Sequence, residues 1–165
     1  MKKDRDCRII RLGDRILRIL DAEEEKVLVI DCVKRGMPKW ISLSEIKNGV
    51  EIPGEEFMEE MERDIPEEMS ASARQTMHER FTVISGILPC VGDKKQRSLR
   101  IADAAEKYKV SQNTVKNYLG LYLAYQDISV LAPREKQEQR ELTQDEKNMR
   151  WALNKFYYTR EKQSL

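Results

Sequence analysis

Residues 98–126 constrain the fold of this chain more than any other stretch, because they have the pattern of two short amphipathic helices separated by a tight turn. Apolar residues recur at steps of three and four on both sides of the turn, as on one face of a helix. They are Ile101, Ala104, Ala105 and Tyr108 before the turn and Val115, Tyr118, Leu119, Tyr122 and Leu123 after it. Ser111 stands just before the second helix, where its hydroxyl can cap the first backbone N–H groups.

Three positions favour a helix-turn-helix over a generic helical hairpin. Ala105 is small enough to let the two helices approach, Val110 supplies an apolar side chain in the turn, and Val115 points back from the second helix. Lys109 occupies the turn position where glycine is usual. We therefore expect either a lysine with left-handed backbone angles or a slightly different turn.

The polar residues of the second helix lie opposite its apolar ones and are expected to face outward. A recognition helix contacts base edges through residues near its N-terminus, and Asn or Gln suits adenine while Lys suits guanine or a phosphate oxygen. The pattern predicts DNA contacts from Gln112, Asn113, Thr114, Lys116 and Asn117. The alternative is a solvated polar face, which any surface helix has. Gly120, in the same helix, indicates the close approach of another backbone, of protein or DNA.

Basic residues accumulate around this motif. Residues 94–116 include seven basic and two acidic side chains, and such a local positive field is what contact with phosphates requires. We expect backbone contacts from Lys94, Lys95, Arg97 and Arg100.

Composition excludes several other classes of protein. The 165 residues are 36% charged and 40% hydrophobic, which is typical of a soluble protein with one ordinary domain or two small ones. The sequence has neither an apolar stretch of membrane-spanning length nor a secretory signal, so we expect a cytoplasmic location. Three scattered cysteines and one histidine give no sign of a zinc site or of a catalytic Cys–His pair, and no cofactor is expected.

Residues 1–50 are expected to form a small β domain. Short apolar runs separated by turn signals predict strands over residues 8–12, 15–20, 27–33 and 39–43. Tight connections imply an antiparallel meander that can curl into a barrel-like sheet, with Trp40 filling it. Its arginines have two interpretations, contact with phosphates or, more commonly, an exposed polar face. They are Arg8, Arg11, Arg15 and Arg18.

Residues 51–69 are expected to be an acidic linker that includes one short helix around residues 55–63. Residues 51–68 hold nine acidic side chains and one basic one, and Pro53, Gly54 and Pro66 interrupt them. Metal-dependent phosphoryl transfer needs carboxylates that converge from a folded scaffold, which a run so rich in helix breakers does not provide.

Residues 70–132 are expected to form the helix-turn-helix domain. Apolar residues from Ala73 to Leu88 recur at helical steps, with Ser70 or Ser72 as a cap. This third helix packs across the motif and offers Arg74 and Arg80 as further candidates for phosphate contact.

Residues 133–165 are expected to form a linker and a last helix. The sequence TQDE at Thr143 matches a capping box, and apolar residues surround much of the helix that follows. Such a helix needs partners on more than one side, which favours a longer parent chain or packing on another subunit.

The segments follow one another in a familiar order: a β meander with VLVIDC and MPKW, an acidic linker, ILPCVGDKKQRS, the motif IADAAEKYKVSQNTVKNYLGLYLAYQ, and ELTQDEKNMRWALNKFYYT. This order resembles the N-terminal region of Mu-type transposases of the DDE, integrase-like superfamily, most specifically over residues 87–158. The resemblance implies an α+β fold that binds double-stranded DNA at transposon ends, alone or with other transposase subunits.

The same resemblance implies a catalytic domain of RNase-H-like fold, whose three carboxylates hold two divalent metals. No such domain fits in this sequence, so we expect the end-binding portion without enzyme activity and assign no catalytic residue. A stand-alone transcriptional regulator with the same motif is the main alternative. A protein-interaction adaptor and a complete enzyme are the other two.

Overall fold

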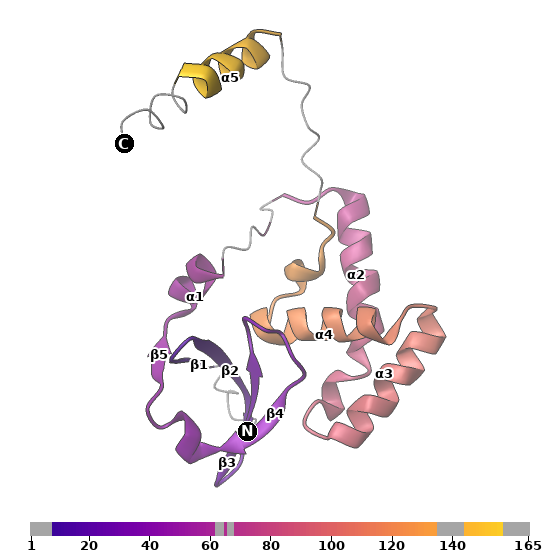
Figure 1. Ribbon diagram of the computed structural model, residues 1–165. Coiled ribbons are helices and arrows are strands. Elements are labelled where there is room, and N and C mark those ends of the chain that lie inside the picture. The colour runs from indigo at the N-terminus through magenta and orange to yellow at the C-terminus, as the bar shows by residue number, and fades with distance from the viewer. Residues whose placement is uncertain (1–7, 62–64, 66–67, 135–143, 157–165) are drawn as a thin grey trace. The chain divides into compact units, whose positions relative to one another are not determined.

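The computed structural model describes residues 8–61, 65, 68–134 and 144–156. The chain forms two compact units, Met1–Pro133 and Arg134–Leu165, which are described separately below. The larger unit begins with an antiparallel sheet and continues with helices, so the predicted α+β class is confirmed (Figure 1).

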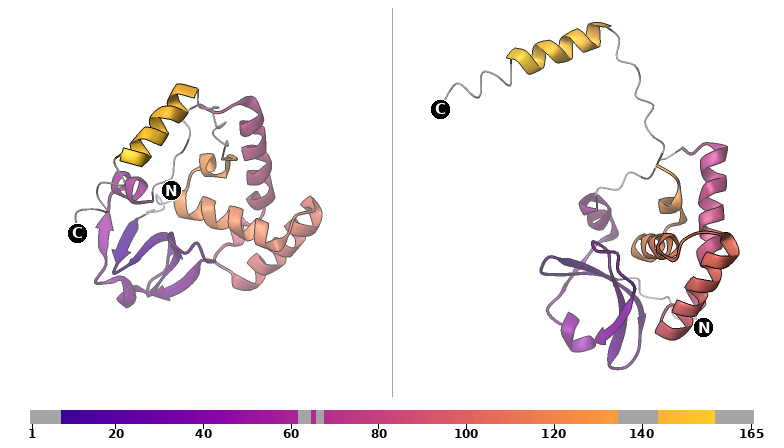
Figure 2. Two further views of the ribbon diagram at one scale, coloured as in Figure 1. Left: turned by 45° about the horizontal axis from the view of Figure 1, so that its top comes forward. Right: turned by 45° about the vertical axis from the view of Figure 1, so that its right-hand side comes forward.

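The sheet has five antiparallel strands in the order β4-β3-β2-β1-β5 and is open, because β4 and β5 are its two edges. The strands are β1 (Ile9–Leu12), β2 (Arg15–Ala22), β3 (Lys26–Asp31), β4 (Lys39–Ser42) and β5 (Val50–Ile52). The first four form the predicted meander, and the sheet is strongly curled (Figure 2). The sequence did not predict β5, a strand of three residues that pairs with β1.

Alternating residues of the strands face two different sets of neighbours, as the two-residue period of a strand requires. Ile9, Leu28 and Ile30 belong to the core that the sheet shares with the helices. Val27 and Val29 lie on the opposite face, in a smaller cluster completed by Ile46 of the 3-10 helix η1 (Leu43–Ile46).

Three helices follow, and each begins at a capping side chain. They are α2 (Ala71–Ser85), α3 (Lys94–Tyr108) and α4 (Gln112–Tyr125). Ser70 caps α2 as predicted, and Asp93 caps α3 by accepting hydrogen bonds from the backbone of Lys95 and Gln96. The 3-10 helices η2 (Leu88–Cys90) and η3 (Ile128–Leu131) complete this part, and α2 contacts α3, α4 and η3.

The sheet and the helices share one hydrophobic core, which joins Ile9, Leu28 and Ile30 of the strands to Ile84, Leu119 and other residues of the helices. Trp40 also connects the sheet to the helices. Its indole N–H donates to the carbonyl oxygen of Gly92 at 2.9 Å, just before α3. Trp40 therefore ties β4 to the helices, in place of the predicted role as filler of the sheet.

Part of the expected acidic linker is folded onto the sheet. Helix α1 (Gly54–Glu60) follows β5, and its Phe57 is only 1% exposed. The Phe57 ring centroid lies 5.6 Å from that of Tyr125 at the end of α4.

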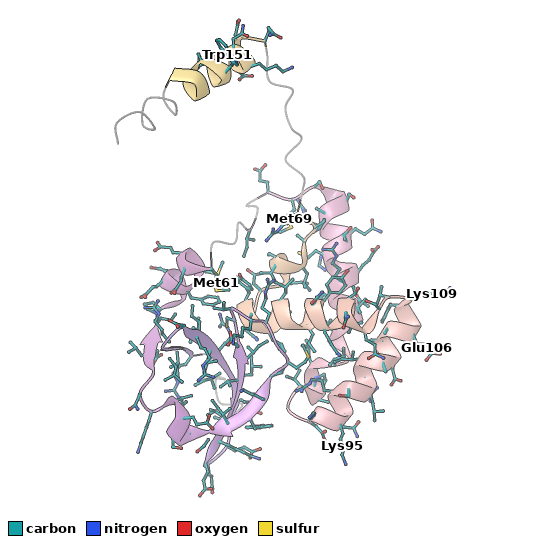
Figure 3. The ribbon with its side chains drawn as sticks, viewed as in Figure 1. Met61, Met69, Lys95, Glu106, Lys109 and Trp151 are labelled. Atoms are coloured by element: carbon teal, nitrogen blue, oxygen red, sulfur yellow. The ribbon has the colours of Figure 1, made fainter. Side chains whose placement is uncertain are left out.

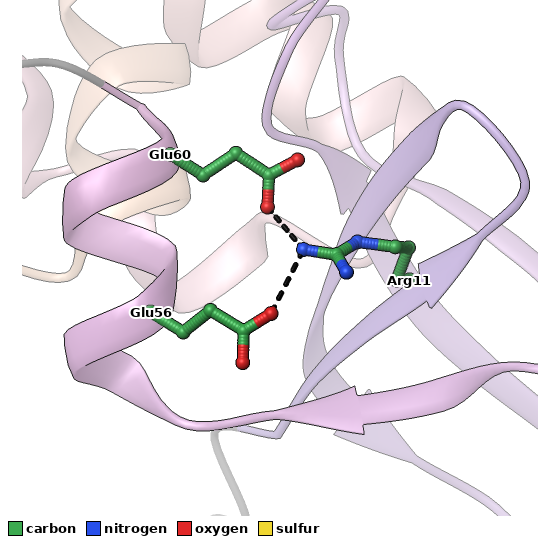
Figure 4. A network of polar contacts seen from close by, with 3 residues as sticks. All are labelled: Arg11, Glu56 and Glu60. Carbon is green, nitrogen blue, oxygen red and sulfur yellow. Dashed lines mark hydrogen bonds and ion pairs between the residues drawn. The ribbon is translucent and has the colours of Figure 1, made fainter.

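Arg11 of β1 forms ion pairs with two carboxylates of α1 (Figure 4). The Arg11 guanidinium donates to Glu56 at 3.0 Å and also to Glu60, and Glu60 contributes most to raising the pKa of Arg11 above its ordinary value. Arg11 is therefore engaged within the protein, which argues against the phosphate interpretation for this residue.

The smaller unit contains α5 (Gln144–Phe156). Asp145 and Glu146 lie in its first turn, where negative charge interacts favourably with the helix dipole. Met149 and Trp151 are 65% and 60% exposed. The predicted cap, Thr143, lies outside the described residues.

We expect Phe57→Ala to lower the free energy of unfolding by about 3–5 kcal/mol, because it removes a fully buried aromatic side chain and leaves a cavity. Urea unfolding followed by circular dichroism measures this loss. Glu59→Ala, an exposed change on the same helix, is the control. Equal stability of the two variants would mean that α1 is not anchored in the core.

Candidate nucleic-acid interface

Three residues, Lys109 to Ser111, connect α3 to α4 in a tight turn, at the place where the sequence predicts one. Lys109 adopts φ 54° and ψ 45°, so the left-handed lysine is the alternative that the chain uses. The backbone N–H of Val110 donates to the carbonyl oxygen of Ala105 at 3.1 Å, which closes the turn. Figure 3 shows Lys109 and Glu106 at this outer corner of the larger unit.

Ser111 caps α4 as the sequence predicted. Its hydroxyl oxygen accepts a hydrogen bond from the backbone N–H of Thr114 at 3.1 Å. The Thr114 hydroxyl also lies 2.9 Å from that of Ser111, and its side chain is only partly exposed. Thr114 therefore holds the start of the helix together and has less freedom to contact DNA than its neighbours.

The inward and outward sides of α4 follow the prediction. Val115 and Leu119 are both 0% exposed. The exposed residues of the first two turns are Gln112, Asn113, Lys116 and Asn117. Successive residues of an α-helix are rotated by about 100°. Asn113, Lys116 and Asn117 therefore form one stripe that Gly120 and Ala124 continue toward the C-terminus.

The C-terminal half of this stripe is covered by the sheet. A Cβ atom on Gly120 would lie 3.1 Å from the carbonyl oxygen of Arg35, so the close approach that this glycine indicated is made by protein backbone. Ala124 is 0% exposed, and its carbonyl oxygen accepts a hydrogen bond from Nε of Arg18 at 2.6 Å. Only the first two turns of α4 are open to a ligand along this stripe.

The basic residues of α3 that are predicted to contact phosphates divide into an exposed group of three and the buried Arg97. Lys94, Lys95 and Arg100 are exposed, and the two lysines lie in the first turn of the helix. Figure 3 shows Lys95 pointing away from the core.

The structure corrects the prediction for Arg97. Its side chain is 6% exposed and donates to the carbonyl oxygen of Val91 at 2.6 Å. Burial lowers the pKa of Arg97 below its ordinary value, although an arginine stays charged at neutral pH. The sequence contained a signal for this position, because Arg97 precedes Ile101 by four residues and so shares the inward face of α3.

Other arginines are also engaged within the larger unit. Arg74 donates to the carbonyl oxygen of Met69, and Arg80 donates to that of Leu131 at 3.0 Å. The guanidinium of Arg80 lies 5.3 Å from the Tyr118 ring centroid. Arg18 is buried, so it does not belong to an exposed basic face of the sheet.

Three further features of the described residues lie outside this interface or concern other chemistry: the Cys32 thiol, one cavity and the arrangement of possible metal ligands. Burial raises the pKa of the Cys32 thiol to about 11, so the thiol is neutral and weakly nucleophilic at neutral pH. A cavity of about 420 Å³ lies between sheet and helices, lined by apolar residues together with Asp21 and Gln126, and none of the predicted DNA contacts borders it. Within residues 8–61, 65, 68–134 and 144–156, no group of three His, Cys, Asp or Glu side chains is arranged to hold a metal ion.

Comparison with known proteins adds no assignment: the chain matches no family model and no curated protein. The resemblance to transposases therefore rests on the sequence motifs alone. Among the parts of the chain that are described, no helix has both the length and the apolar character that crossing a bilayer requires.

We expect Arg97→Met to lower the free energy of unfolding by about 1–3 kcal/mol, because the variant loses a buried hydrogen bond to Val91. Lys95→Met, two residues away and exposed, should stay within about 0.5 kcal/mol of wild type. Thermal or urea unfolding distinguishes the two variants. If Arg97→Met were as stable as Lys95→Met, the buried hydrogen bond would have no structural role.

Proposed function

We propose that this protein binds double-stranded DNA by placing the first two turns of α4 in a major groove. The observation that carries the proposal is the open stripe of Asn113, Lys116 and Asn117 on a helix that is anchored on its other side by the fully buried Val115 and Leu119. A groove about 12 Å wide admits one α-helix, and amide and ammonium groups suit the edges of its base pairs.

The surroundings of α4 support this orientation. Lys94, Lys95 and Arg100 on α3 provide cations for phosphates, and the exposed Lys107 and Lys109 add positive charge at the other end of α3, next to the start of α4. In helix-turn-helix proteins the helix before the turn crosses the DNA backbone while the second helix enters the groove. We assign base contacts to Gln112, Asn113, Lys116 and Asn117, and phosphate contacts to Lys94, Lys95 and Arg100.

The sequence motifs support a more specific role. We propose that the chain acts in the cytoplasm as the end-binding portion of a Mu-type transposase and recognises transposon end repeats. Its partners would be the DNA ends and further transposase subunits. Binding to both ends of a mobile element next to its gene, compared with binding to promoter fragments, tests this role.

A transcriptional regulator is the second candidate, and α5 supplies the observation that favours it. Its exposed Met149 and Trp151 suit a helix that joins two copies of the chain. Sedimentation of the chain with palindromic DNA tests this function, because a stable dimer on a palindrome is typical of repressors. An adaptor function predicts little affinity for DNA at moderate salt.

Asn113→Ala and Asn117→Ala should each weaken binding to a preferred duplex by about 1–3 kcal/mol and binding to random DNA by less. The preferred duplex is obtained by selection from a random pool with the wild-type chain, and fluorescence anisotropy measures both affinities. Asn48→Ala, an exposed change in the sheet region, is the matched control. Equal losses on all DNA sequences would contradict base readout by α4.

Lys94→Gln and Lys95→Gln should weaken binding to preferred and random DNA alike. Each variant should reduce the slope of log affinity against log salt concentration by about 1, because each loses one phosphate contact. Gln96→Ala, an exposed uncharged position in the same turn, should keep the wild-type slope. A change limited to the preferred duplex would argue that these lysines contact bases instead.

A further inference from the structure

A second basic element lies next to the open face of α4. It is the turn between β3 and β4, in which Lys34 and Arg35 are both exposed. The backbone of Arg35 packs against Gly120, the residue that continues the stripe of Asn113, Lys116 and Asn117 toward the C-terminus of α4. The turn therefore forms the border at which the open part of the stripe ends.

Asp31 fixes the conformation of this turn. One of its carboxylate oxygens accepts hydrogen bonds from the backbone N–H groups of Val33 at 3.0 Å and Lys34 at 2.9 Å. Its carbonyl oxygen accepts another from the N–H of Arg35 at 2.8 Å. Arg35 then takes a left-handed conformation with φ 51°, which ends the turn against α4. The two cationic side chains thus extend from a backbone that is held by hydrogen bonds on one side and by α4 on the other.

The distance between this turn and the proposed base contacts is short. Gly120 is three residues beyond Asn117, which is about 4.5 Å along a helix axis. A lysine or arginine side chain is longer than this step. A duplex that receives the first two turns of α4 in its major groove therefore places a phosphate strand within reach of the turn. The charge of Lys34 and Arg35 matches that strand.

We propose that Lys34 and Arg35 contact the phosphate backbone beside the groove entered by α4, so that sheet and helix-turn-helix bind the same duplex. This inference rests on the proposed DNA-binding function. It assigns to the N-terminal sheet a direct part in positioning the DNA, on the flank of α4 next to Gly120. Lys34 and Arg35 fix the position of the duplex and read no base.

The test compares Lys34→Gln and Arg35→Gln with wild type on the selected duplex and on a scrambled duplex. Each change should reduce the salt slope by about 1 and weaken binding to both duplexes by the same factor. Arg35→Lys should keep the wild-type slope, because it keeps the charge. Lys47→Gln is the matched control: Lys47 is exposed and directly follows Ile46, on the sheet face away from the helices.

Hydroxyl-radical footprinting locates the contact. Lys34→Gln and Arg35→Gln should lose protection at sugars on one flank of the site and keep it at the centre, whereas Asn113→Ala should change the centre. The inference is overturned if wild type binds and Asn113→Ala loses sequence preference, while Lys34→Gln and Arg35→Gln keep the slope and footprint of Lys47→Gln. Absence of duplex binding by wild type at low salt would overturn the proposed function as well, so the two failures are distinguishable.

Discussion

The structure of the larger unit depends on the burial of the C-terminal half of α4 against the sheet. The guanidinium of Arg18 is central to this contact, since it donates to the carbonyl oxygen of Ala124 and lies 5.1 Å from the Phe57 ring centroid. A buried charge is costly unless its donors are hydrogen-bonded, so this side chain is compatible with one arrangement of strand and helix. Phe57 links α1 to the same contact, which therefore joins three elements that are distant in sequence.

This contact divides α4 into two functional halves. Where the sheet covers the stripe, the residues are small, Gly120 and Ala124, and where the stripe is open they are amides and a lysine. A glycine in the interior of a helix costs about 1 kcal/mol relative to alanine. The carbonyl oxygen of Arg35 approaches Gly120 so closely that the methyl group of an alanine at this position would be crowded, which explains the glycine. Burial of one half thus holds the other half out to solvent in a fixed direction.

Local patterns in the sequence predicted most elements of this fold, whereas contacts between distant segments were not predictable from it. The periods of two and 3.6 residues placed the meander and the helices, and the hydroxyl of Ser111 marked the start of α4. The charge of Arg97 suggests contact with DNA, whereas its inward helical position predicts burial, and burial is what the structure shows. The ion pairs of Arg11 with Glu56 and Glu60 join residues 45 and 49 positions apart, and no local pattern reports such pairs. For the candidate site, the face of α4 was predictable, but the neighbouring turn at Arg35 was not.

The distribution of charge along α4 restricts how a duplex can approach. The exposed Lys107 and Lys109, at the end of α3 and in the turn that follows it, lie near the N-terminal end of α4, whereas the acidic helix α1 contacts its C-terminal end through Phe57 and Tyr125. The 14 residues of α4 span about 20 Å, which is more than two Debye lengths at physiological ionic strength. The carboxylates of α1 therefore do not cancel the positive field around Asn113 and Lys116, but they repel a phosphate strand that runs toward the far end of α4. Attraction at one end and repulsion at the other favour a duplex that meets α4 at its N-terminal turns.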